Sequence, residues 1–538
     1  MASTLVEVVP PSKSLLDARW KNSSSGRTGT WIFLTALLTG SSYIAIHLAR
    51  DLRNVTVTSA WPYLLLGMAL VIALGFEFVN GFHDTANAVA TVIYTNSLSP
   101  KVAVVLSGLC NLAGVLLSSG TVAFAVVTLL PVDLILKVSS GSGFSMIFAL
   151  LIAAILWNLV TWYLGLPASS SHTLVGSIIG VGLANQLMNP HMGASGLDWA
   201  QLIKVLKALL ISPLLGFALA GMIILLSKPL LRSSALNKAP EGNQPPPWPI
   251  RALMIGTCTG VSFFHGSNDG QKGMGLIMLI LIGTVPTAYA LNHAVGSTEA
   301  QSFLVASAQT SEVLDRYVKP DPGPDPDPRT EITQYLRSGQ ISAGTIPAMQ
   351  AMIAEVDREV AQYKALEAVP AQDQTNIRND MYVTSEAFRL MLKSGNPGFT
   401  PAEAATLKNY EAKLDKSTKY IPDWVKVAVA LALGLGTMVG WRRIVVTVGE
   451  KIGKEHLTYA QGASAGLVTM ATIFAADTWG LPVSTTHILS SGVAGTMAAN
   501  GSGLRLSTVR NIAAGWVFTL PVAALLSGTL YFLFHTFA

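Results

Sequence analysis

The sequence predicts an all-α polytopic membrane protein that is built from two inverted repeats. Three observations lead to this prediction: the chain is 51% hydrophobic and only 12% charged, long apolar stretches recur along it, and two short motifs each occur twice in the same order. The charge content is about half that of a typical soluble domain. Of the 30 acidic residues, 18 lie between positions 291 and 423, so the rest of the chain is very poor in acidic residues.

Apolar stretches that are long enough for a membrane-spanning helix, about 20 residues, occur about eleven times along the chain. They lie near residues 31–49, 61–80, 102–130, 143–164, 174–188, 202–227, 251–290, 424–441, 457–476, 484–499 and 511–535. Several of them are interrupted, which predicts discontinuous helices and re-entrant hairpins. The first stretch follows a polar start and lacks a small-residue cleavage site, so we expect a membrane helix there and not a signal peptide.

Basic residues gather in particular loops between these stretches. They are Lys13, Arg19, Lys21, Arg27, Lys228, Arg232, Lys238, Arg251, Arg442, Arg443, Lys451, Lys454, Arg505 and Arg510. Eleven alternating crossings put every one of these clusters on the cytoplasmic side, as the positive-inside rule expects. We therefore expect an inner (plasma) membrane protein with a cytoplasmic N-terminus and an external C-terminus. The basic residues form no stripe with interleaved aromatic residues, so a nucleic-acid partner is not expected.

The two repeated motifs define the domain organisation. Residues 81–87 (Gly-Phe-His-Asp-Thr-Ala-Asn) align with a motif 185 positions later, and residues 165–172 (Gly-Leu-Pro-Ala-Ser-Ser-Ser-His) with one 315 positions later. The difference matches a 133-residue polar insertion inside the second repeat. By the crossing count, the first motif enters the membrane from opposite sides in the two halves. This is the inverted architecture in which binding sites form near the midplane.

The predicted domains follow from this alignment. They are an N-terminal segment with an extra membrane helix (1–60), repeat one (61–228), a cytoplasmic linker (229–250), the first part of repeat two (251–290), a mainly helical external domain (291–423) and the remainder of repeat two (424–538). Within the external domain, the proline-rich run at 319–328 predicts an extended spacer, because its prolines exclude a regular helix.

The motif Gly-Leu-Pro-x-Ser-Ser/Thr-Ser/Thr-His predicts an anion site. Its proline should end one helix and its hydroxyl residues should cap the next, so that a helix N-terminus is buried at membrane depth. Free backbone N–H groups and the helix dipole favour an anion there. Six hydroxyls are available for a tetrahedral oxyanion: Ser169, Ser170, Ser171, Ser484, Thr485 and Thr486. The alternative is that these residues only cap broken helices or permit close packing.

The other motif places two polar side chains on one helical turn. Asp84 has Asn87 three residues later, whereas Asp269 has Lys272 at the same spacing. A carboxylate with an amide could coordinate a small cation, and a carboxylate beside an ammonium can neutralise charge or titrate. Glycines around both motifs permit a helix break. The alternative for Asp269 and Lys272 is a purely structural ion pair.

Further polar residues in apolar surroundings are weaker candidates. Glu77 lies seven residues before Asp84, on roughly the same helix face, and is either a proton-path residue or a packed acid. Four histidines beside the motifs could shuttle protons: His83, His172, His265 and His487. We expect no resident metal and no cofactor. The sequence lacks a nucleotide-binding loop and the Gly-x-Ser-x-Gly nucleophile elbow, so an enzyme is not expected.

Together the four motifs resemble those of the inorganic phosphate transporter (PiT) family, and in particular its bacterial low-affinity members. The likeness covers roughly residues 61–290 and 424–535. It implies secondary active symport of phosphate with a cation. By motif position it implies that the six hydroxyl residues bind phosphate and that Asp84, Asn87, Asn268 and Asp269 serve cation or proton coupling.

The coupling ion is where the sequence departs from the family pattern. Sodium-coupled members resemble Gly-x-Asn-Asp-x-x-Asn in both halves, whereas here His83 and Lys272 replace one Asn each. We therefore expect proton coupling, with Lys272 and Glu77 among the participating groups. The resemblance also implies neutral metal-phosphate complexes as a transported species, and a homodimer is compatible with it. The alternatives are a sodium-coupled phosphate permease, a permease for another oxyanion such as sulfate or arsenate, and a membrane phosphate sensor.

Overall fold

The computed structural model describes residues 27–53, 61–84, 86–127, 129, 141–188, 199–230, 235–240, 244–292, 297–318, 327–363 and 369–537. Within these ranges the chain is almost entirely helical and contains no β-strand, only an isolated bridge between Gly453 and Leu504. The predicted all-helical class is therefore confirmed.

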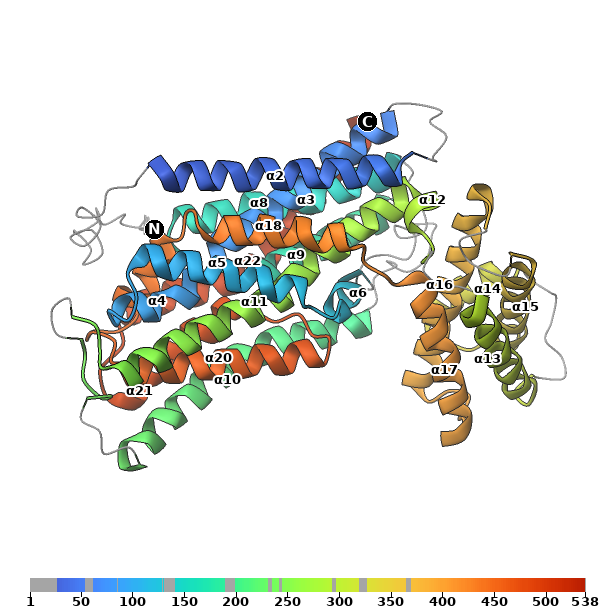
Figure 1. The fold of residues 1–538 in the computed structure, drawn as a ribbon. Helices are drawn as coiled ribbons and strands as arrows, with labels where there is room; N and C mark the ends of the chain where they lie inside the picture. Colours follow the sequence, from blue (N-terminus) through green and yellow to red (C-terminus); the bar gives the residue numbers. More distant parts are fainter. Residues whose placement is uncertain are drawn as a thin grey trace, which may run out of the picture.

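Most helices lie side by side in one elongated bundle, with α2 along its outside (Figure 1). The bundle consists of α2 (Arg27–Asp51), α3 (Trp61–Asp84), α4 (Ala86–Tyr94), α5 (Pro100–Leu116), α6 (Thr121–Val127), α8 (Gly141–Tyr163), α9 (Ser170–Met188), α10 (Trp199–Leu230), α11 (Trp248–Thr284), α12 (Pro286–Tyr289), α18 (Asp423–Thr437), α19 (Arg442–Val446), the π-helix η3 (Thr447–Lys451), α20 (Tyr459–Thr478), α21 (Thr485–Asn500) and α22 (Leu506–Phe537).

Several bundle helices are long and apolar enough to cross a membrane. Among the described residues five helices meet this condition, or seven if each of two bent pairs forms one span. The bent pairs are α5 with α6, at 76°, and α18 with α19 and η3, at 54°. The chain is thus a helical membrane protein, while eleven crossings remain a prediction. Helices α9 and α21 fall outside the count. Helix α21 has only 16 residues, and the Ser, Thr, Gly and His residues of α9 lower its mean hydropathy.

Helices of the same kind follow one another in the same order in the two halves. The order α3/α4, α5, α6, α8, α9, α10 corresponds to α11, α18, α19/η3, α20, α21, α22. Helix packing recurs in the same way, because α9 packs on α22 as α21 packs on α10, and α3 packs on α18 as α11 packs on α5. Each half therefore makes its main contacts with helices of the other half.

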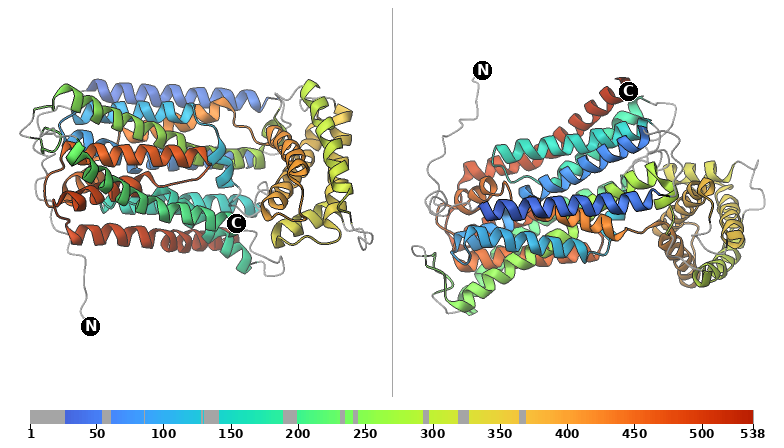
Figure 2. Two further views of the ribbon diagram at one scale, coloured as in Figure 1. Left: turned by 90° about the horizontal axis from the view of Figure 1, so that it is seen from below. Right: turned by 45° about the horizontal axis from the view of Figure 1, so that its top comes forward.

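The inserted segment forms a separate helical domain between α12 and α18. Its helices are α13 (Ser297–Asp315), α14 (Pro328–Ser338), α15 (Thr345–Tyr363), α16 (Ala371–Ser394) and α17 (Pro401–Thr418). They enclose a hydrophobic core of their own that includes Met381, Phe388 and Tyr410. The domain lies at one end of the bundle and its helices run across the bundle direction (Figures 1 and 2). Of the predicted proline-rich spacer, residues 319–326 lie outside the described residues.

Glycine permits the helices of the two halves to pack backbone against backbone. A Cβ atom added at Gly180 of α9 would lie 2.0 Å from the carbonyl oxygen of Ala524 on α22. At Gly495 of α21 it would lie 2.1 Å from the carbonyl oxygen of Phe217 on α10. Small residues at such contacts are typical of helix packing in membranes, where close backbone approach replaces the hydrophobic driving force. These contacts hold α9 and α21 at fixed positions in the bundle.

We therefore expect Gly180→Ala and Gly495→Ala each to destabilise the protein, because the added methyl group would meet backbone that cannot rotate away. Overpacking of this kind costs roughly 1 to 3 kcal/mol, which thermal unfolding of the purified protein in detergent would detect as a lower midpoint. Gly67→Ala and Gly256→Ala are matched controls, since nothing lies within 4 Å of a Cβ atom at either position. The controls should keep or raise the midpoint, because Ala favours a helix over Gly by about 1 kcal/mol. Equal effects in both sets would contradict this explanation.

Candidate functional site

Helices α9 and α21 begin inside the bundle, as the sequence predicts. The turn before each helix contains a glycine in the left-handed conformation, Gly165 with φ +67° and Gly480 with φ +64°. A glycine in this conformation is the usual way to end a helix. Helices α8 and α20 therefore end at these glycine turns, before Pro167 and Pro482 are reached. The prediction that the prolines end these helices is wrong, because glycine adopts the turn conformation first.

The two hydroxyl motifs lie together in the bundle, and their first members cap the helices. The Oγ atom of Ser169 accepts a hydrogen bond from the backbone N–H of His172 at 3.2 Å. In the second half, Ser484 Oγ accepts one from the N–H of His487 at 3.1 Å. Each capping hydroxyl keeps its own hydrogen, which can still be donated to an oxyanion.

The second members of the motifs have buried hydroxyls that are not hydrogen bonded. Ser170 and Thr485 are both 1% exposed, and among the described residues neither Ser170 Oγ nor Thr485 Oγ1 has a hydrogen-bond partner. The large majority of buried side-chain polar atoms have a partner, so exceptions require an explanation. These two occupy equivalent positions at the start of α9 and α21. Two unpaired donors at two helix N-termini form the arrangement that an oxyanion would satisfy.

The third members of the motifs connect the two halves. Ser171 Oγ accepts a hydrogen bond from Lys272 Nζ at 2.5 Å, so a hydroxyl of the first half contacts a charge of the second. Thr486 Oγ1 accepts from Asn87 Nδ2 at 2.8 Å and donates to Asp84 at 2.9 Å, which is the reciprocal contact. Lys272 and Asn87 occupy equivalent positions of the two repeats. The hydroxyl motif of each half is therefore bound by the acidic motif of the other.

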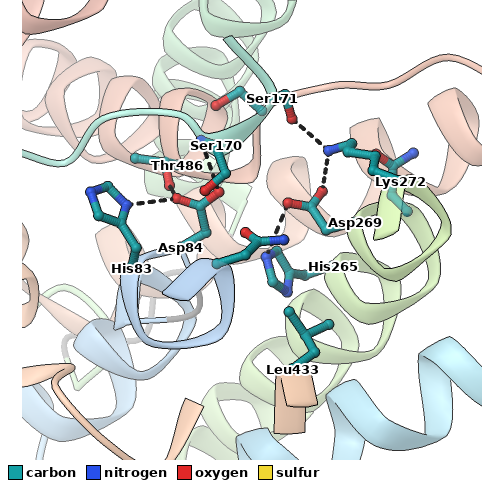
Figure 3. A network of polar contacts seen from close by, with 12 residues as sticks. His83, Asp84, Ser170, Ser171, His265, Asp269, Lys272, Leu433 and Thr486 are labelled. Carbon is teal, nitrogen blue, oxygen red and sulfur yellow. Dashed lines mark hydrogen bonds and ion pairs between the residues drawn. The ribbon is translucent and has the colours of Figure 1, made fainter. Parts of the chain in front are cut away.

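Asp84 lies at the end of α3 and accepts several hydrogen bonds (Figure 3). Besides Thr486, its carboxylate contacts the backbone N–H of Ser170 at 3.3 Å and His83 Nδ1 at 2.9 Å. The other ring nitrogen of His83 lies 3.0 Å from Thr161 Oγ1. The predicted set of coupling residues lacks His83, which was expected only as one of four possible proton shuttles, and the structure makes it a direct partner of Asp84. The signal in the sequence is that His83 replaces an Asn of the family motif.

Asp269 forms the predicted contact with Lys272 and one further contact. Its Oδ1 atom lies 2.6 Å from Lys272 Nζ, and its Oδ2 atom lies 3.4 Å from His265 Nε2. Ligand atoms of Asp84, His265 and Asp269 all lie within 4.8 Å of one another, which makes this a group that could hold a metal ion. No metal ligands are predicted from the sequence, because the pairing of the histidines depends on the fold.

A chain of hydrogen bonds orients His265. Its Nδ1 atom lies 2.9 Å from Asn111 Oδ1, and the amide nitrogen of Asn111 donates to Thr437 Oγ1 at 3.0 Å. Thr437 in turn donates its hydrogen to the carbonyl oxygen of Leu433 at 2.9 Å. The Thr437 hydroxyl donates its hydrogen to Leu433, so Thr437 Oγ1 accepts from the amide nitrogen of Asn111. The amide oxygen of Asn111 therefore faces His265, and Nδ1 of His265 is the donor to it. The Nε2 atom is then directed at Asp269 and can act as an acceptor or a ligand.

Glu77 is fully buried where α3 meets α11. Its Oε2 atom accepts a long hydrogen bond from Asn80 Nδ2 at 3.5 Å, and its Oε1 atom has no partner among the described residues. A Cβ atom at Gly273 would lie only 2.5 Å from this Oε1, so the glycine allows Glu77 to contact α11. Gly273 provides the space that the Glu77 carboxyl group occupies, and the proton-path role of Glu77 remains a prediction.

The second acidic motif lies within one continuous helix, because α11 runs without a break through Asp269. The break that the glycines of the second motif would permit is therefore absent. Instead Gly266 lies against the backbone of Asn111, where a Cβ atom would be 2.2 Å from its carbonyl oxygen.

Other polar residues near the site hold its elements in place. Asn268 donates to the carbonyl oxygen of Leu481 at 3.1 Å and accepts from the N–H of Val483 at 3.4 Å, so both ends of its amide bind the second hydroxyl motif. Asp477 accepts hydrogen bonds from Ser267 and Gln271, both at 2.7 Å, and connects α20 to α11.

The four histidines form two groups. His83 and His265 contact the carboxylates, whereas the rings of His172 and His487 lie 4.4 Å apart and pack on each other. His487 also stacks on Trp516 at 4.1 Å. The second group is therefore an aromatic contact between the two hydroxyl motifs.

Comparison with known proteins gives the family. Residues 80–527 match the model of the phosphate transporter family. The chain is 41% identical over 486 residues to the low-affinity inorganic phosphate transporter PitA of Escherichia coli K12, covering 87% of this chain and 96% of PitA. It is 40% identical to PitB of the same organism with the same coverage. It is 28% identical to a probable low-affinity inorganic phosphate transporter of Bacillus subtilis, covering 88% of this chain and 98% of that protein.

A solved structure described as "The sodium-dependent phosphate transporter" is 18% identical, with a TM-score of 0.47, and covers 88% of this chain and all of that one. The family model spans most of the sequence, and the Escherichia coli relatives match it along nearly their whole length. This chain therefore belongs to the phosphate transporter family.

Proposed function

We propose that this protein imports inorganic phosphate across the membrane by secondary active symport with protons. The observation that carries the proposal is the pair of unpaired, buried hydroxyls of Ser170 and Thr485 at the starts of α9 and α21. Helix N-termini favour anions, and hydroxyls donate to oxyanion oxygens. Lys272 adds a positive charge that contacts Ser171, the residue after Ser170. The names of the PitA and PitB relatives support phosphate as the anion.

An inverted relation of the two halves would explain how such a site opens to either side. The repeated helix order and the reciprocal packing of α9 on α22 and α21 on α10 support it. In transporters built from inverted repeats, rocking of one part against the other exposes a central site alternately. Phosphate would then bind where the two hydroxyl motifs meet.

The inserted domain would lie outside the cell. It occupies the end of the bundle to which α11 leads, whereas α11 begins at the opposite end (Figure 1). Arg251, in the first turn of α11, belongs to the basic clusters that the positive-inside rule assigns to the cytoplasm. The same orientation gives a cytoplasmic N-terminus and an external C-terminus.

Protons are the proposed coupling ion because of Lys272. Its ammonium lies 2.6 Å from Asp269 and 2.5 Å from Ser171, at the position where the first half has Asn87. An ammonium donates only and repels a cation, so it stands in place of a bound sodium ion in the second half. Asp84, with its His83 partner, and Glu77 remain as buried groups that can carry a proton.

We expect Ser170→Ala and Thr485→Ala each to raise the KM for phosphate uptake. Losing a hydrogen bond to a charged group costs roughly 1.5 to 3 kcal/mol, which corresponds to a roughly 10- to 100-fold weaker affinity. Uptake of radiolabelled phosphate into proteoliposomes would measure it. Thr496→Ala on α21 is the matched control, since its buried hydroxyl donates to Val493 of its own helix.

An unchanged KM in both variants would remove the support for the hydroxyl site. Excess sulfate in the same assay separates two of the alternatives. It should inhibit phosphate uptake by a general oxyanion permease and leave uptake by a phosphate transporter unchanged. Accumulation of phosphate inside the proteoliposomes would show a transporter, since a membrane sensor would move no phosphate.

We expect an inward proton gradient to drive phosphate uptake in sodium-free vesicles and a protonophore to abolish it. A sodium gradient at matched pH should add nothing, because Lys272 excludes the ion. Lys272→Asn should gain sodium stimulation, since it restores the amide that Asn87 provides in the first half. Lys272→Met serves as the control that removes the charge without supplying an oxygen ligand, and it should gain none. Strict sodium dependence of the unmodified protein would overturn the proposed coupling.

A second candidate is import of a neutral metal-phosphate complex. The cluster of Asp84, His265 and Asp269 favours it, because carboxylate and imidazole ligands could bind the metal of the substrate beside the hydroxyl groups. Lys272 would then have to leave Asp269 and pair with the phosphate, because its ammonium repels a metal ion bound at Asp269. Here the metal would be cargo, bound together with phosphate.

If metal-phosphate is the transported species, chelation of divalent cations should abolish phosphate uptake. A labelled divalent cation should also accumulate in a fixed ratio to phosphate. Asp269→Asn should lower uptake of the metal and of phosphate together, in vesicles loaded under identical conditions. Full phosphate uptake in the presence of a chelator would exclude this candidate while leaving proton symport intact.

A further inference from the structure

A small cavity lies at the junction between the inserted domain and the helix bundle, away from the hydroxyl site. One wall is apolar and comes from α6 and α11, with Phe124 and Met278 among its residues. The facing wall belongs to the inserted domain and includes Arg378 and Tyr382 of α16 and Lys419 after α17. The cavity volume is about 20 Å³. A group held there would contact both parts of the protein.

Arg378 is a buried guanidinium without an anionic partner. It is 4% exposed, and its Nε atom has no hydrogen-bond partner among the described residues. One terminal nitrogen donates to the neutral amide oxygen of Asn379 at 3.1 Å. The guanidinium also lies over the ring of Tyr382, 4.7 Å from its centre. Among the described residues no carboxylate lies within ion-pair distance of it. The charge of Glu386 acts on Arg378 from farther away, but Glu386 forms its own ion pairs with Arg389 and Lys419.

The other charged contacts of the inserted domain make Arg378 exceptional. Six basic side chains of this domain each pair with at least one carboxylate: Arg316, Arg329, Arg358, Arg389, Lys416 and Lys419. All six are more exposed than Arg378. A buried charge without a partner is strongly unfavourable, so the position of Arg378 needs a compensating anion.

We propose that Arg378 binds a phosphate group at this junction. A guanidinium presents paired donors that match the oxygens of phosphate, and charge-assisted hydrogen bonds of this kind are the strong ones. A cavity of about 20 Å³ accepts a water-sized group, which is the size of one phosphate oxygen. The rest of the group would displace the flexible side chain of Met278. Lys419 lies at the same wall, where it is already paired with Glu386 and Asp415.

Two sources could supply such a phosphate group. One is free inorganic phosphate, which would be held at the outer end of α6 and α11 before it reaches the hydroxyl site; this source rests on the proposed function. The other is the headgroup of an anionic phospholipid, because the opposite wall of the cavity is formed by bundle helices. Both sources offer the same chemistry to Arg378.

Binding stoichiometry tests the proposal in the full-length protein. Equilibrium dialysis of delipidated protein in detergent with radiolabelled phosphate should give two sites per chain for free phosphate, and Arg378→Gln should reduce them to one. The double variant Ser170→Ala/Thr485→Ala should weaken the other site and keep the junction site. Arg358→Gln is the control, since it removes an exposed charge of the same domain and should keep both sites.

The phospholipid source gives a different result. Native mass spectrometry of protein purified with phosphatidylglycerol should then show one retained lipid, which Arg378→Gln loses and Arg358→Gln keeps. If Arg378→Gln does not fold, Arg378→Lys keeps the charge without the fork of donors and should bind roughly tenfold more weakly at the junction.

Failure of the junction site and failure of the hydroxyl site give different results. If the Arg378 variants bind as much phosphate and as much phospholipid as the unmodified protein, the junction site is excluded. If Arg378→Gln loses a site while the double hydroxyl variant loses none, the junction site stands and the proposed phosphate site between α9 and α21 fails.

Discussion

The burial of two carboxylates in an apolar helix bundle is the constraint on which the site depends. Asp84 and Asp269 are each 1% exposed, and an ionised group in such surroundings is costly unless it is paired and hydrogen bonded. Each aspartate therefore has an imidazole beside it, and each motif reaches a hydroxyl of the other half, through Thr486 for Asp84 and through Lys272 and Ser171 for Asp269. The compensation of charge and the joining of the two halves are the same set of contacts.

Close backbone packing makes these contacts possible. Side-chain hydroxyls are short, so a hydroxyl of one half reaches a carboxylate of the other only if the helices approach closely. The glycines at positions 180 and 495 allow α9 and α21 to pack directly on the backbones of α22 and α10. Gly273 of α11 leaves space for the side chain of Glu77 of α3. The glycine contacts thus set the positions at which the polar groups of the site meet.

The two halves share a scaffold but differ in chemistry. Asn87 of the first half corresponds to Lys272 of the second, and His83 corresponds to Asn268. In the first half the motif places an imidazole against Asp84, whereas in the second half Asn268 holds the backbone of the hydroxyl motif and His265 contacts Asp269 from one helical turn away. The inserted domain, which interrupts only one half, adds a further difference outside the site.

By itself the sequence determined the helical membrane class, the family, the repeat and which motif residues lie together. These follow from local properties, because hydropathy reports membrane helices and a motif that occurs twice reports duplication. Only the tertiary structure decided that glycine ends α8 and α20, that α11 runs unbroken, and that His83 and His265 contact the carboxylates. It also decided that Arg378 is buried without an anion at the junction with the bundle. The physical reason is that hydrogen bonds and ion pairs between distant helices depend on distances of a few ångströms, which the order of residues does not fix.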